Sequence, residues 1–324
     1  MKAIQIRQTG GPAALELVEL PAPSPGDGEV LVRQTAVGVN FIDVYHRNGA
    51  YAMALPFVPG MEAAGSVAAV GAGVTLFKPG DRVAYPSKLG AYAESAVVPA
   101  ERAVAVPDGV SARDACALML QGMTAHYLAH STFSLQPGHI ALVHAGAGGV
   151  GLLLTQLAKA CGATVISTVS TEAKAVLSTN AGADHVILYT KEDFAAATRR
   201  IAPQGVDVVY DSVGKTTFDE SLRCLRPRGM MVLYGGSSGQ VPAFDLQRLA
   251  ANGSLFVTRP TLGNYIADRK ELAERARDLF DAYQRGALRT RIGAEYPLAD
   301  ARQAHADLEA RKTTGKLLLI PPGA

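Results

Sequence analysis

The residues best suited to binding a cofactor are the glycines of Gly146-Ala147-Gly148-Gly149-Val150-Gly151, which fit the pattern GxGxxG. They follow an apolar segment, 140–144, that predicts a buried strand, and they precede a segment, 150–160, with helical apolar spacing. Small residues let the backbone approach a pyrophosphate, and the first turn of a helix supplies free N–H groups with a positive partial charge. This context predicts a dinucleotide-binding loop, although a tight strand-to-helix turn without a ligand gives the same pattern.

The end of the next predicted strand indicates which dinucleotide is bound. NAD-binding folds of this kind place an Asp or Glu about 20 residues after the loop, where it accepts hydrogen bonds from the ribose 2′-hydroxyl. Here the strand 164–169 is followed by the neutral Ser170, and Lys174 comes about one helical turn later. A hydroxyl and a cation suit a 2′-phosphate, so the sequence favours NADPH over NADH. Two alternatives stay open, because Glu172 is close enough to face the ribose and Lys174 has the features of a solvated helix lysine.

Strands and helices alternate through the middle of the chain. The predicted strands are 140–144, 164–169, 185–189, 206–210, 230–234 and 254–258, and the predicted helices between them are 150–160, 171–180, 191–201 and 218–225. Strands that are unbroken apolar runs, alternating with helices, predict a parallel sheet covered on both faces. We therefore expect an α/β fold with a doubly wound, six-stranded Rossmann sheet.

The two ends of the chain differ from this middle part. Residues 1 to about 120 contain short β-like runs separated by Pro-Gly pairs, which favour a barrel-like or sandwich-like arrangement. The later part predicts a helix at 266–285, a strand at 291–296, a helix at 299–311 and a last strand at 316–320. A last strand needs a sheet to join. We therefore predict a Rossmann domain, 122–262, inserted into a β-rich domain made of 1–121 and 263–324.

Composition excludes several classes of protein. Of the 324 residues 48% are hydrophobic and 19% charged, which argues against disorder. The net charge of +2 gives no electrostatic reason to bind nucleic acid or a membrane surface. No apolar run approaches the ~20 residues of a membrane helix, and the first residues lack the apolar core of a signal peptide. Three widely spaced cysteines indicate neither a disulfide framework nor a metal cluster, so we expect a cytoplasmic protein.

Short segments spread over the whole chain match one enzyme family. They are GVNFIDVY at 38–45, PGMEAAG at 59–65, KPGDRV at 78–83, HAGAGGVG at 144–151, YDSVG at 210–214, GGSSG at 235–239, FVTRP at 256–260 and TGK at 314–316. Together they resemble the zinc-free quinone oxidoreductase (zeta-crystallin-like) branch of the medium-chain dehydrogenase/reductase superfamily. The resemblance implies a GroES-like catalytic domain around the Rossmann domain. It also implies an NADPH:quinone oxidoreductase.

The resemblance also implies particular site residues. It places four candidate catalytic residues beside the nicotinamide, and we expect them to bind rather than to exchange protons: Asn40, Asp43, Tyr45 and Tyr51. The implied cofactor-binding residues are Asn40, Tyr45, Thr124, Tyr127, Gly148, Gly149, Val150, Ser170, Lys174, Tyr189, Ser212, Tyr234, Gly235, Gly236, Ser237, Phe256, Val257, Thr258 and Lys316. Two simpler roles stay open, since Asp43 also suits the cap of a helix that begins at Phe41, and Tyr51 suits loop packing.

The same resemblance argues against a metal site. Zinc-dependent relatives carry Cys where this chain has Asn40 and His where it has Met61, which leaves only Glu62 of the matching positions. Catalytic zinc needs about three convergent protein ligands, so we predict no metal and activity without zinc. We interpret Glu62 as a buried carboxylate paired with a base such as Arg82.

Three functions remain under consideration at this point. A quinone accepts hydride readily, so the protein mainly has to hold the nicotinamide against it. An NADPH-dependent enone or enoyl-thioester reductase needs the same scaffold, and an RNA-binding crystallin-like protein that retains the cofactor site is the third. The chain lacks the basic blocks of nucleic-acid modules. The expected partners are a quinone or another small electrophile and a second copy of the chain, because an open apolar edge at 254–258 predicts a homodimer through Rossmann sheet edges.

Overall fold

The computed structural model describes residues 1–323, and the chain divides into two compact units. Unit 1 contains Met1–Met123, Ile266–Gly286 and the chain from Thr290 onward. Unit 2 contains Thr124–Tyr265 and the short piece Ala287–Arg289. The inserted domain was expected at 122–262. The long segment of unit 2 begins two residues later, at Thr124, and ends three residues later, at Tyr265.

Unit 2 is built on a six-stranded sheet in which every neighbouring pair is parallel. The strands are β8 (Ile140–Val143), β9 (Thr164–Val169), β10 (His185–Leu188), β11 (Val206–Asp211), β12 (Leu225–Leu233) and β13 (Phe256–Thr258). Their order is β10-β9-β8-β11-β12-β13. This is the 3-2-1-4-5-6 order of a doubly wound dinucleotide-binding sheet, so the predicted Rossmann fold is confirmed.

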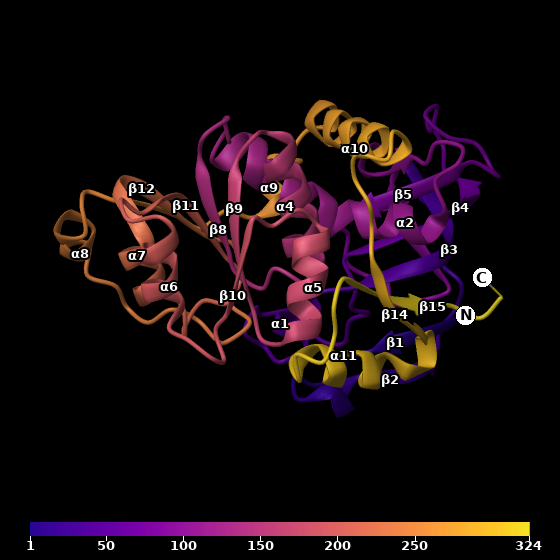
Figure 1. Ribbon diagram of the computed structural model, residues 1–324. Helices are drawn as coiled ribbons and strands as arrows, with labels where there is room; N and C mark the ends of the chain where they lie inside the picture. Colours follow the sequence, from indigo (N-terminus) through magenta and orange to yellow (C-terminus); the bar gives the residue numbers. More distant parts are fainter. Residues whose placement is uncertain (324) are drawn as a thin grey trace. The chain divides into compact units, whose positions relative to one another are not determined.

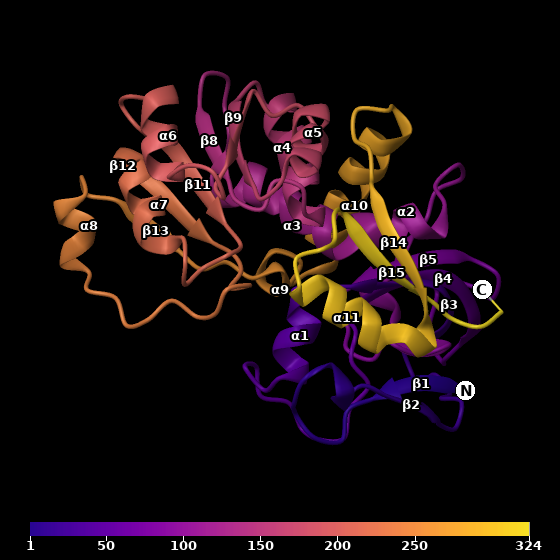
Figure 2. The same cartoon turned by 60° about the horizontal axis from the view of Figure 1, so that its bottom comes forward.

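Helices cover the sheet of unit 2 on both faces. They include α4 (Gly149–Ala160), α5 (Glu172–Asn180), α6 (Phe194–Ile201), α7 (Phe218–Cys224), α8 (Gln247–Ala251) and α9 (Leu262–Tyr265). Helix α4 packs against α5, and α6 packs against α7. Figures 1 and 2 show these two pairs on opposite sides of the strands. The strands between them carry fully buried residues such as Leu142, Ile166 and Val209, as expected of a sheet with no solvated face.

Unit 1 is built on antiparallel pairs around one long strand, β3 (Glu29–Val39). The other strands are β1 (Lys2–Gln5), β2 (Glu16–Glu19), β4 (Glu62–Val70), β5 (Arg82–Pro86), β6 (Ser95–Pro99), β7 (Val104–Ala105), β14 (Ile292–Pro297) and β15 (Lys316–Ile320). Strand β3 pairs with β4, β6 and β15, and β14 pairs with β15. The last strand therefore joins the N-terminal sheet, as predicted for a β-rich domain interrupted by an insertion (Figure 1).

The helices of unit 1 include α1 (Phe41–Arg47), α2 (Ala112–Ala117), α10 (Arg269–Gln284) and α11 (Ala301–Glu309). The segment from Ala112 to Thr132 is not one regular α-helix. A π-helical segment, Leu118–Gly122, follows α2, and a second one, Leu128–Thr132, follows α3 (Met123–Tyr127). Among the described residues, no helix combines the length and the apolar character that crossing a bilayer requires.

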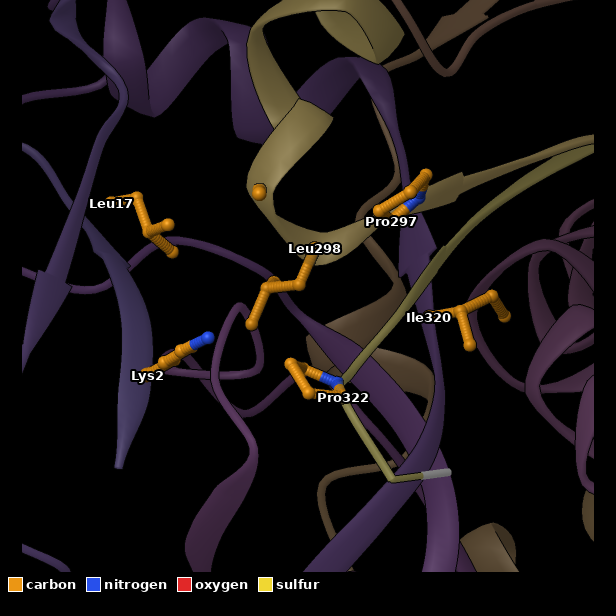
Figure 3. Close-up of a pocket in the computed structure, with 7 residues that line it drawn as sticks. Lys2, Leu17, Pro297, Leu298, Ile320 and Pro322 are labelled. Atoms are coloured by element: carbon orange, nitrogen blue, oxygen red, sulfur yellow. The ribbon is translucent and has the colours of Figure 1, made fainter.

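A shallow and mostly apolar pocket lies at the surface of unit 1, between the β1–β2 hairpin and the end of β15. Its lining residues are Lys2, Leu17, Pro297, Leu298, Ala299, Ile320 and Pro322, and Figure 3 shows six of these side chains around it. The predicted site residues do not contribute to this lining. The site therefore has to be sought elsewhere.

Candidate active site

The turn that begins α1 carries the first two candidate catalytic residues. Asn40 is the N-cap of α1 in extended conformation, and its backbone N–H donates to Asp43 Oδ2 at 2.8 Å. Asp43 therefore caps this helix, as considered from the sequence: its carboxylate, at the third helical position, accepts a hydrogen bond from the free N–H of the N-cap residue. Both residues are nearly fully buried, at 5% and 0% exposure.

Buried charges and amides meet at the side chain of Asn40. Its Nδ2 donates to Glu62 Oε1 at 2.6 Å, and its Oδ1 accepts from Lys316 Nζ at 3.0 Å. Lys316 Nζ also donates to Glu62 Oε1, so the three side chains form a closed triangle. Glu62 and Lys316 are 0% and 1% exposed. Two opposite charges in contact, with their remaining groups hydrogen-bonded, are what a buried ion pair requires.

Glu62 was expected to pair with a base such as Arg82, and this choice of base is wrong. Glu62 is buried and paired as expected, but the base is Lys316. The register of β4 and β5 places Glu62 opposite Pro86 and Arg82 opposite Ser66, four residues away along the sheet. Arg82 instead donates to the carbonyl oxygens of Pro107 and Val110.

The π-helical segment Leu118–Gly122 completes this cluster. The backbone N–H of Leu120 donates to Glu62 Oε2 at 2.6 Å, and Gln121 Nε2 donates to Asn40 Oδ1 at 3.1 Å. A π-helical turn shifts the usual backbone pairing, which leaves an N–H free to bind a group outside the helix. The irregularity thus has a definite result, since it supplies two donors to the Asn40–Glu62 pair.

The carboxyl of Asp43 lies in a second buried set of hydrogen bonds. Tyr92 OH contacts Asp43 Oδ2 at 3.1 Å and His305 Nε2 at 2.9 Å, and Arg47 contacts His305 Nδ1 at 3.0 Å. Burial raises the pKa of Asp43 to about 7, against the opposing effects of its hydrogen bond from Asn40 and of nearby Lys316. Burial lowers the pKa of His305 to about 3, with a further contribution from Arg47. Asp43 is therefore the group of this set that titrates near neutral pH.

Tyr45 and Tyr51 lie together at the other end of α1. Their rings are 5.2 Å apart at 61°, which is an edge-to-face contact, and the N–H of Tyr51 donates to the Tyr45 carbonyl at 3.0 Å. Tyr51 is 38% exposed and Tyr45 is half-buried. The loop packing considered for Tyr51 is therefore present, and it leaves part of the ring accessible.

The glycine loop of unit 2 joins β8 to α4 with the geometry that the motif predicts. A Cβ at Gly146 would collide with the Ser167 side chain, and one at Gly151 would collide with the Ala145 carbonyl. The first and last glycines thus permit close packing. Gly148 is the N-cap of the 12-residue helix α4, and no side chain of the described residues caps it. Its terminal N–H groups are therefore available to an anion such as a pyrophosphate.

His144 anchors the start of this loop. It is buried, and its two ring nitrogens contact Thr168 Oγ1 at 2.8 Å and Ser221 Oγ at 2.9 Å. The imidazole therefore links the end of β8 to β9 and to α7. Burial lowers its pKa, with an opposing effect from Asp211. A packing role, and not metal binding, is what this environment supports.

The residues expected to hold a 2′-phosphate, Ser170, Lys174 and Tyr189, lie directly after β9, in the first turn of α5 and directly after β10. Tyr189 is 39% exposed, and Thr171 caps α5 by accepting from the Lys174 N–H at 3.3 Å. Glu172, the residue that complicated the cofactor assignment, forms an ion pair with Lys191 at 2.6 Å. Its charge is therefore matched locally.

The remaining cofactor candidates fall into two groups. Ser212, Tyr234, Gly235, Gly236 and Ser237 are half-buried at the ends of β11 and β12, where ligands of such sheets bind, and Phe256, Val257 and Thr258 form the edge strand β13. In contrast, Tyr127 is 2% exposed and stacks on Tyr265 with ring centroids 4.2 Å apart, and Thr124 is 7% exposed. Lys316 is held by Glu62 and Asn40. We therefore expect Tyr127 and Lys316 to act on a ligand through their neighbours.

Comparisons with known proteins agree with this geometry. Residues 26–108 match the model of the alcohol dehydrogenase GroES-like domain, and residues 181–319 match that of the zinc-binding dehydrogenases. A quinone oxidoreductase of Pseudomonas aeruginosa is 46% identical over 99% of both chains. The crystal structure of Escherichia coli quinone oxidoreductase complexed with NADPH is 43% identical, has a TM-score of 0.97, and covers 99% of this chain and 100% of its own.

This chain belongs to the quinone oxidoreductase branch of the medium-chain dehydrogenase/reductase superfamily. A second relative widens the chemistry of the branch. A 2-haloacrylate reductase of Burkholderia is 44% identical over 98% of both chains. Relatives at similar levels of identity are thus named for the reduction of two different electrophiles, quinones and 2-haloacrylates.

One matched family model is that of the zinc-binding dehydrogenases, but the side chains around Asn40 have other partners than a metal ion. Asn40 is hydrogen-bonded to Glu62, Lys316 and Gln121, and no group of three His, Cys, Asp or Glu side chains within residues 1–323 is arranged to hold a metal ion. An ammonium group stands beside Glu62, where a zinc site would need another ligand. The side chains that this protein has at these positions, Asn40, Met61 and Glu62, therefore do not fit a zinc ion.

Several residues of the site were not foreseen from the sequence. Gln121, Tyr92, His305 and Arg47 make the contacts described above, and none of them lies in a motif that points to chemistry. One signal was present for His305, since it shares a helix face with the buried Ala301 and Ala304, where an uncompensated polar group is costly. That signal indicates a partner but does not identify it.

Proposed function

We propose that this protein is an NADPH-dependent quinone reductase. The observation that carries the proposal is the uncapped glycine-loop helix α4 together with a neutral Ser170 directly after β9 and a cationic Lys174 in the first turn of α5. This combination suits a dinucleotide with a 2′-phosphate. Full-length relatives named quinone oxidoreductase, one of them solved with NADPH, support the same function.

The residues of the site have separate tasks in this proposal. The α4 N-terminus with Gly148, Gly149 and Val150 holds the pyrophosphate, and Ser170, Lys174 and Tyr189 hold the 2′-phosphate. When bound, NADPH supplies the hydride. Asn40 presents an amide whose orientation is fixed by three neighbours, and Tyr45 and Tyr51 supply aromatic surface for a flat substrate. These side chains bind and orient, and quinones need little further activation.

The decisive test is a steady-state assay of NADPH oxidation with a panel of quinones. We expect 1,4-benzoquinones and naphthoquinones to be reduced at rates well above the rate without protein. The panel also contains 2-haloacrylates and simple enones, since one relative is named 2-haloacrylate reductase. Faster turnover of these alkenes than of every quinone would assign the chain to the second function. Lack of NADPH oxidation with both classes would reject both.

We further propose that the protein is a homodimer joined through β13. In the described chain β13 pairs only with β12, and its other edge carries Phe256 and Val257 at 57% and 38% exposure. Leu246, before α8, is 71% exposed. An open apolar edge favours pairing with a second copy about a twofold axis. Sedimentation should give about twice the 33.8 kDa subunit mass, and Val257→Lys should give the monomer. A monomeric wild type at micromolar concentration contradicts the proposal.

We also propose a cytoplasmic location. Cys116, Cys161 and Cys224 are all unpaired, and unpaired thiols suit a reducing compartment. Cell fractionation with the native protein tests this proposal. Recovery with periplasmic or secreted proteins would contradict it.

A further inference from the structure

Hydrogen bonds join four buried side chains of unit 1 into a chain that begins and ends on α1, at the turn that carries Asn40. It runs from Arg47 on α1 through His305 on α11 and Tyr92 before β6 to Asp43 on α1, with contacts of 3.0, 2.9 and 3.1 Å. All four residues are at most 1% exposed. At its outer end Arg47 also donates to the Gly10 carbonyl and forms an ion pair with Glu309 at 2.8 Å.

Every hydrogen bond of this chain has only one possible direction. A guanidinium can only donate, so His305 Nδ1 must accept from Arg47. The low pKa of His305, caused by burial and by Arg47, keeps the ring neutral, and its single proton is therefore on Nε2. This N–H donates to the Tyr92 oxygen. The Tyr92 proton is then left for Asp43 Oδ2, which also accepts from the Asn40 N–H at 2.8 Å.

Asp43 has few other partners to define its position. Among the described residues, no group hydrogen-bonds its buried Oδ1. The other titratable groups that influence it are Lys316 on β15, which favours the carboxylate, and Glu62 on β4, which opposes it. Both of these are engaged with each other and with Asn40. The orientation of the Asp43 carboxyl therefore depends on the Tyr92 hydroxyl and the Asn40 amide.

We propose that Tyr92, His305 and Arg47 are positioning residues for reduction of the substrate. Their chain of hydrogen bonds, in which each donor has one possible acceptor, holds the Asp43 carboxylate against the backbone N–H of Asn40 and so fixes the turn that carries Asn40. The inference rests on the proposed function. Ionised Asp43 binds both donors more strongly than the protonated acid. The ionised form is therefore the one that holds the turn, and kcat falls when Asp43 takes up a proton.

Activity over a range of pH separates positioning from simple packing. We would measure kcat and KM with NADPH and a benzoquinone from pH 5 to 9 for wild type, Tyr92→Phe, His305→Leu and His305→Gln. Loss of one charged hydrogen bond lowers kcat of Tyr92→Phe about tenfold at pH 7. Because this bond lowers the pKa of Asp43, its loss also moves the acid midpoint of kcat to higher pH. The KM of the quinone should change much less.

The two His305 variants test the direction of the chain. A glutamine amide accepts from Arg47 through its oxygen and donates to Tyr92 through its nitrogen, so His305→Gln should restore most of the kcat that His305→Leu loses. Tyr296→Phe is the matched control, since it removes a similar tyrosine–carboxylate bond, to Asp307 Oδ2 at 3.0 Å, in the same unit. Tyr296→Phe should leave the midpoint unchanged. A loss of kcat in Tyr92→Phe without a shifted midpoint, or His305→Gln as poor as His305→Leu, overturns the inference.

Unfolding measurements keep this test independent of the proposed function. If wild type oxidises no NADPH with any substrate, the proposed function fails. The hydrogen bonds from Arg47 to Asp43 can still be tested by thermal unfolding of the protein from pH 4 to 9. The pKa of Asp43 is raised on folding, so its stabilising effect is lost as pH rises through that pKa. In Tyr92→Phe this loss should extend to higher pH, and His305→Leu gives the same readout if Tyr92→Phe does not fold. An unchanged pH dependence in the variant that folds overturns the inference.

Discussion

The carboxylate of Glu62 fills the space beside Gly38 that a Cβ atom at that position would need. Gly38 lies in β3 and Glu62 begins β4, so the missing side chain of one strand makes room for the buried charge of the next. A glycine weakens a strand, and here it allows the ion pair between Glu62 and Lys316 to form inside the sheet.

Gly38→Ala should therefore destabilise unit 1 strongly. The added methyl group displaces the Glu62 carboxylate from Lys316, and disruption of a buried ion pair costs about 3 kcal/mol or more. Urea denaturation followed by circular dichroism measures the effect. Gly11→Ala is the control, because Gly11 is exposed and a Cβ there has no neighbour within 4 Å. Equal losses in the two variants would contradict the assignment.

Lys316→Met should lower the free energy of unfolding by about 4 kcal/mol, because it leaves the Glu62 carboxylate buried without its cation. The double variant Lys316→Met with Glu62→Gln removes both charges and should recover at least half of the loss. Denaturation of wild type, both single variants and the double variant completes the thermodynamic cycle. Losses that simply add would show that the two residues are not coupled.

The pH dependence of stability should reverse between two variants of the buried chain. The pKa of His305 is lowered on folding to about 3, so its contribution is lost as pH falls from 6.5 toward 3. The pKa of Asp43 is raised from 3.8 to about 7, so its contribution is lost as pH rises across that range. In wild type the two effects oppose each other, each with a slope of at most about 1.4 kcal/mol per pH unit.

Relative to wild type, Asp43→Asn should therefore lose stability toward acid, and His305→Gln should lose stability toward neutral pH. Thermal unfolding in steps of half a pH unit measures both slopes. The comparison uses differences from wild type, so that carboxylates elsewhere in the chain cancel. Slopes of the same sign in both variants would contradict the protonation states assigned here.

Cofactor preference should depend on Lys174 and Ser170. A lysine beside a 2′-phosphate is worth about tenfold in affinity, so Lys174→Ala should raise KM for NADPH and leave KM for NADH nearly unchanged. Ser170→Asp should reverse the preference, because it repels phosphate and binds a free 2′-hydroxyl. The exposed Lys78 of unit 1 provides a control, Lys78→Ala. Equal weakening of both cofactors by Lys174→Ala would show a structural role for the lysine.

Activity should not require zinc. Asn40 and Met61 occupy the two positions where zinc-dependent relatives have Cys and His, and Lys316 stands beside the remaining Glu62. The purified protein should keep its full quinone-reducing activity after exhaustive chelation, and elemental analysis should find less than stoichiometric zinc. Loss of activity that added zinc restores would reveal ligands outside this set.

Strands made mostly of β-branched and aliphatic residues could be predicted well. The expected limits of 164–169 and 316–320 agree with β9 and β15, because both segments are short runs of β-branched or aliphatic residues that are bounded by turn residues. The strand expected from Ser254 begins at Phe256, since Ser254 has a φ of 57° and belongs to a turn. The strand expected from Met230 begins at Leu225, although Pro227 and Gly229 argue against a strand there.

The polar site was less accessible to prediction because its partners are distant in the chain. Asn40 and Glu62 were identified by motif, but the cation they share follows 254 positions after Glu62. Only the pairing of Leu317 with Val39 brings Lys316 beside Asn40. The π-helical turn at 118–122 also has no clear sequence signal, so the donors from Leu120 and Gln121 could not be expected.

The insertion of unit 2 between the strands of unit 1 has a consequence for biosynthesis. The ribosome makes Asn40 and Glu62 early, then the whole of Thr124–Tyr265, and only afterwards Lys316. Unit 2 is nearly continuous in sequence and is complete while β3 still lacks its neighbour β15. Until that strand emerges, the Glu62 carboxylate has no cation to balance it and cannot be buried at low cost. We therefore expect unit 2 to fold before unit 1 during synthesis and the N-terminal sheet to close last.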